Sequence, residues 1–122
     1  MNRALKEIKR IAIKLIRGNY EITIERLRYL EAVYHQGYRS DLIDQGVDKI
    51  ITLEIASAQA ALTDLQARLR AFERNYQMKS ETFYRRFRSR RLGDASDFVE
   101  WSSFYEMWNS VRKRIEILRG QL

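Results

Sequence analysis

The 122-residue chain contains no cysteine and no proline. Without cysteine it can form neither a disulfide framework nor a thiolate zinc site, and we expect a cytoplasmic protein, since that compartment is reducing. Proline breaks helix interiors and also punctuates loops, so its absence favours long helices joined by few connections. The single histidine, His35, lacks the neighbours that a catalytic triad or a two-histidine metal site requires.

Several other features of enzymes and membrane proteins are missing. No apolar run is long enough to cross a bilayer, and basic residues interrupt every apolar stretch near the start, so we expect neither a membrane span nor a signal peptide. No glycine-rich phosphate loop is present. Asp94, Asp97 and Glu100 are spaced three apart, but all-oxygen cation sites use more ligands, so helix capping is the preferred interpretation. We therefore expect no enzyme activity, no cofactor and no bound metal.

The composition is that of a folded protein with a basic surface. Hydrophobic residues make up 45% and charged residues 32% of the chain, and the net charge is +7. Such a balance permits binding to nucleic acid, to an acidic protein or to an anionic membrane surface, without choosing among them. We divide the chain into a basic N-terminal helical segment, residues 1–37, and a helical hairpin domain, residues 38–122.

The N-terminal segment begins with an amphipathic pattern. Residues 1–17 carry apolar side chains at spacings of three and four, among six cations and a single acid, Glu7. Gly18-Asn19 predicts a stop. Residues 20–38 begin with an alternating apolar pattern, but helical spacing follows, so a helix that ends near Gly37 is preferred.

Two long apolar series predict the hairpin. Ser40 or Asp41 is expected to cap a helix that runs to about Tyr76, and its apolar residues alternate at spacings of four and three. The series is Ile51, Ile55, Ala58, Leu62, Leu65, Leu69, Phe72 and Tyr76. The last helix has a similar series: Phe98, Trp101, Phe104 or Tyr105, Trp108, Val111, Ile115, Leu118 and Leu122. Two such seams predict an all-α fold, a long antiparallel helical hairpin of coiled-coil type.

A short helix is expected to connect the two long ones. It begins at Ser80 and stops near Leu92-Gly93-Asp94, where glycine would supply the left-handed cap, and Asp94, Ser96 or Asp97 would cap the last helix. Aromatic residues gather around this connection and are expected to form a rigid structural cluster. Its predicted members are Phe83, Phe87, Phe98, Trp101, Phe104, Tyr105 and Trp108.

Two basic features are candidate contact sites for nucleic acid or for an acidic partner. The first is an arginine cluster, made of Arg85, Arg86, Arg88, Arg90 and Arg91, which would hold phosphates while Tyr84 and Phe87 stack on bases. The alternative is that Phe83 and Phe87 face the core while the arginines form a solvated rim, partly paired with nearby acids. The second is the basic N-terminal helix with Lys6, Lys9 and Arg10, for which packing or a protein partner is preferred to a membrane surface.

Three segments resemble a known family. They are Tyr38-Arg-Ser-Asp-Leu-Ile-Asp-Gln-Gly, Glu81-Thr-Phe-Tyr-Arg-Arg-Phe and Leu92-Gly-Asp-Ala-Ser-Asp-Phe-Val-Glu-Trp-Ser-Ser-Phe-Tyr-Glu-Met. They are similar to small helical bacterial and archaeal proteins, whose members resemble the antitoxin half of toxin–antitoxin gene pairs. The resemblance implies a shared core of Phe98, Trp101, Phe104, Tyr105 and Trp108. The chain departs from the family in the arginines of the connection and in its first 37 residues.

Three functions follow as hypotheses. The first is a non-enzymatic protein-interaction module that resembles an antitoxin and neutralises a toxin-like partner by laying a helix across its groove. The second is nucleic-acid binding through the arginine cluster and the basic N-terminal helix. The third is a structural homo-oligomer, in which hairpins pair into a four-helix bundle.

Overall fold

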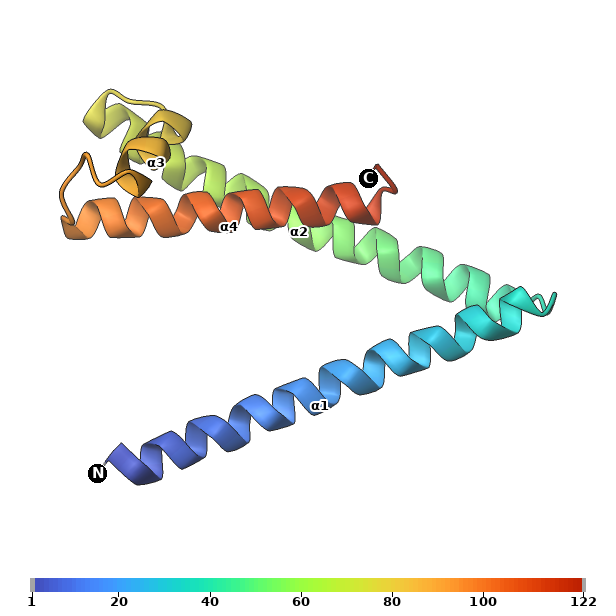
Figure 1. Ribbon diagram of the computed structural model, residues 1–122. Coiled ribbons are helices and arrows are strands. Elements are labelled where there is room, and N and C mark those ends of the chain that lie inside the picture. The colour runs from blue at the N-terminus through green and yellow to red at the C-terminus, as the bar shows by residue number, and fades with distance from the viewer. Residues whose placement is uncertain (1, 122) are drawn as a thin grey trace. The chain divides into compact units, whose positions relative to one another are not determined.

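The computed structural model describes residues 2–121, and these form four α-helices without a strand. The helices are α1 (Asn2–His35), α2 (Asp41–Tyr76), α3 (Ser80–Arg88) and α4 (Ser96–Leu118), labelled in Figure 1. The prediction of an all-α fold is confirmed. The chain divides into two compact units, Met1–Gly46 and Val47–Leu122, and the division falls within α2, whereas the sequence suggested a boundary after residue 37.

Helix α1 is continuous through Gly18, so the predicted stop at Gly18-Asn19 is wrong. A glycine inside a helix costs only about 1 kcal/mol relative to alanine, and each added residue still gains a backbone hydrogen bond. The hydroxyl of Thr23 also donates to the carbonyl of Asn19 over 3.1 Å. Residues 20–24 are helical, as preferred, and the alternating apolar pattern there does not form a strand.

The turn after α1 is held by a small polar network within the first unit. Gly37 has φ of +91°, a left-handed conformation that glycine adopts without strain. The predicted cap is confirmed, because the amide of Ile43 donates to the Ser40 hydroxyl over 3.2 Å. The Tyr34 hydroxyl donates to the Asp44 carboxylate and lies 2.9 Å from the Ser40 carbonyl oxygen. This network joins the end of α1 to the first turn of α2.

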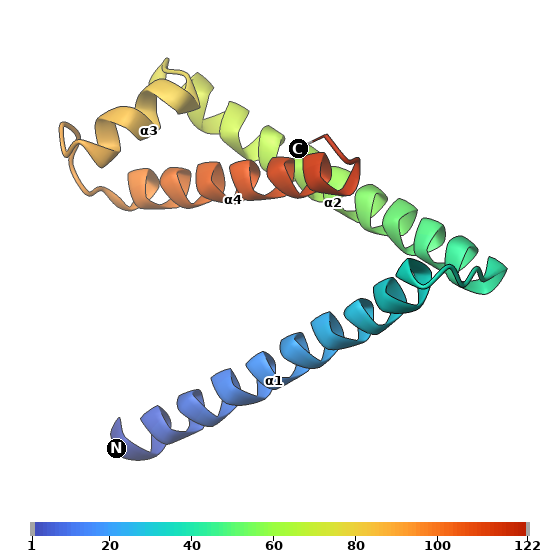
Figure 2. The same cartoon turned by 45° about the vertical axis from the view of Figure 1, so that its right-hand side comes forward.

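In the second unit, α2 and α4 pack antiparallel, as Figures 1 and 2 show. Ala58 and Leu65 of α2 bury against Val111 and Ile115 of α4, with Leu62, Phe104 and Trp108 packed beside them. Residues late in α2 meet residues early in α4, since Phe72 stacks on Trp101 with ring centroids 5.5 Å apart. The predicted hairpin is confirmed, and the middle of both apolar seams is buried. Ile51, Ile55 and Leu118 of the predicted series are half-buried and lie outside this cluster. Leu122, the last member of the predicted series, lies outside the described residues.

Helix α3 ends at Arg88, earlier than the predicted stop near Leu92-Gly93-Asp94. The left-handed residue is Arg90, with φ of +60°, and not Gly93. Two backbone hydrogen bonds accompany this conformation: the Arg90 amide donates to the Phe87 carbonyl over 3.1 Å, and the Arg91 amide to the Arg86 carbonyl over 3.0 Å. Satisfying the last carbonyls of the helix offsets the steric cost of a left-handed arginine.

The predicted side-chain cap of α4 is also wrong. Ala95 occupies the N-cap and no side chain caps the free amides there. Asp97 instead accepts a hydrogen bond from the Tyr76 hydroxyl over 2.6 Å. The Asp97 carboxylate therefore bonds to the end of α2, although local sequence rules predict that it caps α4.

The seam of the hairpin yields a stability test. Leu65→Ala removes a side chain that is 5% exposed, and should lower the free energy of unfolding by about 2 to 5 kcal/mol. The matched control is Leu53→Ala on the same helix, where the side chain is 59% exposed and the expected change is below about 0.5 kcal/mol. Urea unfolding followed by circular dichroism measures both. Equal losses would contradict the assigned packing of α2 on α4.

Candidate functional site

The aromatic cluster lies where α2, α3 and α4 meet. Phe83 and Trp101 are completely buried, and their rings stack with centroids 3.8 Å apart and an interplanar angle of 5°. Leu69 completes the buried cluster, and the remaining members pack against it. These are the other five predicted residues, Phe87, Phe98, Phe104, Tyr105 and Trp108, together with Phe72, Met78, Tyr84 and Leu92. The structure therefore brings all seven predicted aromatic residues into one core, whose evident role is to hold the end of the hairpin.

Three polar contacts fix α3 within this core. The indole Nε1 of Trp101 donates to the buried Ser80 hydroxyl over 3.0 Å. The amide of Ser80, at the start of α3, donates to the carboxylate of Glu73 on α2 over 2.8 Å. The Tyr84 hydroxyl donates to the Glu106 carboxylate on α4 over 2.7 Å. These bonds join α3 to both long helices, and so determine which side of α3 faces outward.

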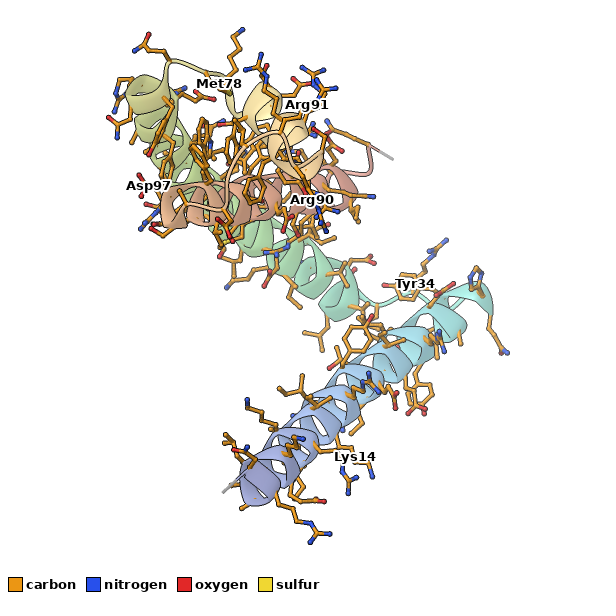
Figure 3. All side chains as sticks on the ribbon, turned by 60° about the vertical axis from the view of Figure 1, so that its left-hand side comes forward. Lys14, Tyr34, Met78, Arg90, Arg91 and Asp97 are labelled. Atoms are coloured by element: carbon orange, nitrogen blue, oxygen red, sulfur yellow. The ribbon has the colours of Figure 1, made fainter. Side chains whose placement is uncertain are left out.

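The arginine cluster occupies that outward side and the following loop. All five arginines are exposed, while Phe83 is buried and Phe87 half-buried beneath them. The predicted pairing with Asp94, Asp97 or Glu100 does not occur: none of the ion pairs between residues 2 and 121 involves these arginines. Figure 3 labels Arg90 and Arg91, which lie in the loop after α3. The arrangement presents a cationic edge rather than a base-stacking platform, because the aromatic rings point inward.

The loop beside this edge is hollowed. Its depression has a volume of about 680 Å³ and is lined by Phe87, Arg88, Arg90, Leu92, Gly93 and Asp94. A second depression of about 270 Å³ lies between α2 and α4, where Arg70, Glu73 and Trp108 contribute to its wall. The indole Nε1 of Trp108 is buried without a hydrogen-bond partner among the described residues. The smaller depression is also lined by Ser80, whose hydroxyl accepts the hydrogen bond from Trp101 and whose amide donates to Glu73.

The basic half of α1, which we define as residues 3–17, carries the predicted contacts Lys6, Lys9 and Arg10. All three are exposed, and Arg10 forms an exposed ion pair with Glu7 over 3.2 Å. Lys14, labelled in Figure 3, extends from the same helix. These cations belong to the unit Met1–Gly46, whereas the arginine cluster belongs to the unit Val47–Leu122.

The second half of α1, residues 19–35, is a candidate that the sequence interpretation left without a role. Six of its large apolar side chains are exposed, and no residue of α1 is buried. They are Tyr20, Ile22, Leu27, Tyr29, Leu30 and Val33. The sequence did contain a signal for this surface. The six residues occupy more than one face of the helix, whereas packing against the rest of a protein requires only a single apolar stripe.

The remaining ionisable candidates take part in surface contacts. His35 is exposed and lies 3.2 Å from the Glu31 carboxylate. Between residues 2 and 121, no group of three or more histidine, cysteine, aspartate or glutamate residues is arranged to hold a metal ion. In the same span, no helix has both the length and the apolar character that crossing a bilayer demands.

Comparison with protein-family models, with characterised proteins and with solved structures finds no match for this chain.

The hydrogen bond between Tyr84 and Glu106 predicts how the stability of the fold changes at alkaline pH. The hydrogen bond to Glu106, helped by burial, raises the pKa of Tyr84 above its ordinary value of 10.0. The folded state therefore holds this proton more tightly, and the stabilisation is fully present below pH 10 and is lost as the pH rises through the higher pKa. Tyr84→Phe should be less stable than the parent protein at pH 8, and the difference should shrink above pH 10. Urea unfolding at both pH values tests this, and a constant difference would contradict the assigned bond.

Proposed function

We propose that the protein is a non-enzymatic, cytoplasmic interaction protein that binds a partner protein through residues 20–33 of α1. One observation carries the proposal. Six large apolar side chains in this stretch are each between 39% and 66% exposed, on a helix with no buried residue. A helix that exposes this many large apolar side chains to water is typical of a protein interaction site.

The chemistry of these residues favours a protein as the ligand. Tyr20 and Tyr29 combine a large apolar ring with a hydroxyl, and tyrosine is enriched at protein interfaces for that reason. The charges of residues 19–35 are mixed, with three glutamates and two arginines, so recognition would rest on apolar contact rather than on net charge. An amphipathic helix seated in an apolar groove is a common mode of protein recognition.

The resemblance to antitoxin-type proteins supports a more specific proposal. In this proposal the chain neutralises a toxin-like partner by laying a helix across the groove in which that partner acts. A long helix followed by an independently packed hairpin suits this task, because the hairpin needs none of the residues that α1 would contribute to the partner. We propose that α1 performs this blocking role.

Co-purification with matched variants tests the proposal. The tagged full chain is expressed in its own host, beside Leu30→Glu/Val33→Glu on α1 and Val99→Glu on α4. Leu30, Val33 and Val99 are 39%, 41% and 50% exposed, and glutamate keeps good helix propensity, so all the variants should fold. We expect one stoichiometric partner with the parent chain and with Val99→Glu, and its loss with the α1 variant. Expression of that partner alone should arrest growth, and co-expression of the parent chain should restore it.

Two results would refute this proposal. One is a partner retained equally by the α1 variant, which would place the interface elsewhere. The other is that no stoichiometric partner co-purifies, and that light scattering shows the chain to be a stable homo-oligomer. In that case Leu30→Glu/Val33→Glu would disrupt the homo-oligomer. That second result would assign the apolar surface of α1 to self-association.

Nucleic-acid binding through the arginine cluster is the second candidate function. It is favoured by five exposed arginines on α3 and its following loop, none of them in an ion pair among residues 2–121. Arg85→Gln/Arg86→Gln/Arg88→Gln should weaken binding to single- or double-stranded DNA or RNA and reduce its salt dependence. Fluorescence anisotropy at low and high salt measures this, with Arg112→Gln/Lys113→Gln/Arg114→Gln on α4 as the control. Affinity unchanged in the arginine-cluster variant would exclude this candidate.

A further inference from the structure

The basic half of α1 separates apolar and cationic side chains onto opposite faces. At about 100° per residue, one arc of about 140° contains aliphatic residues without a charge. Its members are Ala4, Leu5, Ile8, Ile11, Ala12, Leu15 and Ile16, and the five large ones are between 51% and 69% exposed. All six cations, together with Glu7 and Ile13, lie on the remaining face. This half of α1 is therefore amphipathic by itself, with an aliphatic face and a cationic face. It differs in this from the second half of α1, which contains tyrosines.

The charges of this half are not neutralised within the described chain. Six cations face a single acid, which gives residues 3–17 a net charge of +5, and only Arg10 forms an ion pair there. The first turn of α1 contains no acidic residue. Because the N-terminal end of a helix carries a partial positive charge, Arg3 and Lys6 near that end add repulsion instead of relieving it. An external anionic surface would remove this unfavourable arrangement.

The sequence favoured packing or a protein partner for this helix, but α1 has no buried residue. We propose that residues 3–17 of α1 lie in the plane of an anionic lipid bilayer surface. A bilayer interface offers an apolar region to the aliphatic arc and phosphate groups to the cations that border it, so one body satisfies both faces. Nucleic acid would leave the aliphatic arc in water. The absence of aromatic and acidic residues from the arc distinguishes this half from residues 20–33, for which a protein groove is the better match.

The inference is independent of the proposed protein-binding function, since the two use different halves of α1. It also differs from a membrane span, because the segment is about 22 Å long and bears a charge on every turn. A helix that lies parallel to the surface needs neither more length nor fewer charges.

Vesicle flotation of the full chain tests the proposal. Vesicles of phosphatidylcholine alone are compared with vesicles in which a third of the lipid is phosphatidylglycerol. The parent chain should float only with the anionic vesicles. Lys9→Gln/Lys14→Gln should weaken binding by about fivefold for each cation removed. Ile8→Gln/Leu15→Gln should weaken it by about tenfold for each side chain. Leu27→Gln/Arg28→Gln, the same kinds of change in the second half of α1, serves as the control and should bind like the parent.

Three outcomes would overturn the proposal. The first is failure of the parent chain to float with anionic vesicles. The second is equal binding by the parent and by Ile8→Gln/Leu15→Gln, which would mean that charge alone attracts the chain. The third is loss of binding in the Leu27→Gln/Arg28→Gln control as great as that in the Ile8→Gln/Leu15→Gln variant. Because Leu30 and Val33 remain intact in every vesicle variant, loss of flotation leaves the test of the protein partner unaffected.

Discussion

The burial of Trp101 is the interaction on which the hairpin depends. The centroid of its ring lies 3.8 Å from that of Phe83 on α3 and 5.5 Å from that of Phe72 on α2, so one side chain of α4 contacts both α2 and α3. Its indole nitrogen is satisfied by Ser80, and the Ser80 amide is satisfied by Glu73. A buried indole without such a partner would carry a desolvation cost. Apolar stacking and hydrogen bonding therefore select the same arrangement of the three helices.

This arrangement separates structural residues from candidate contact residues. Because α3 turns Phe83 and Phe87 inward, its arginines can only face solvent, and their exposure is a consequence of the core. Helix α1 differs from α3 in this respect, because its large apolar residues take no part in a buried cluster. The hairpin thus accounts for stability, while the proposed partner and lipid surfaces both use residues that stability does not require.

The parts of the fold that depend on long periodic patterns could be predicted from the sequence. The seams of α2 and α4 repeat over many turns, so the antiparallel hairpin follows from residues such as Leu65 and Ile115 alone. Local rules were less successful where a distant contact or a backbone hydrogen bond competes with them. Asp97 bonds to Tyr76 instead of capping α4, and Arg90 takes the left-handed position expected at Gly93. Gly18 shows that a weak helix former does not end a long helix by itself.

The candidate surfaces, too, were predictable from the sequence only in part. The composition of the arginine cluster and of the basic half of α1 was evident, but only the fold shows which side chains point away from the core. The apolar surface of residues 20–33 was not predicted as a site, because an apolar helix pattern cannot distinguish a buried face from an exposed one. That distinction depends on which other helix, if any, packs against the segment.

Amide hydrogen exchange of the isolated chain, at a concentration where it is monomeric, tests the central claim most directly. The claim is that the hairpin is stabilised around Trp101 while α1 has no tertiary burial of its own. Amides near Leu69 and Trp101 should then exchange most slowly, and those of α1 should exchange at rates typical of an unpacked helix. Protection in α1 as strong as that around Trp101 would contradict the account.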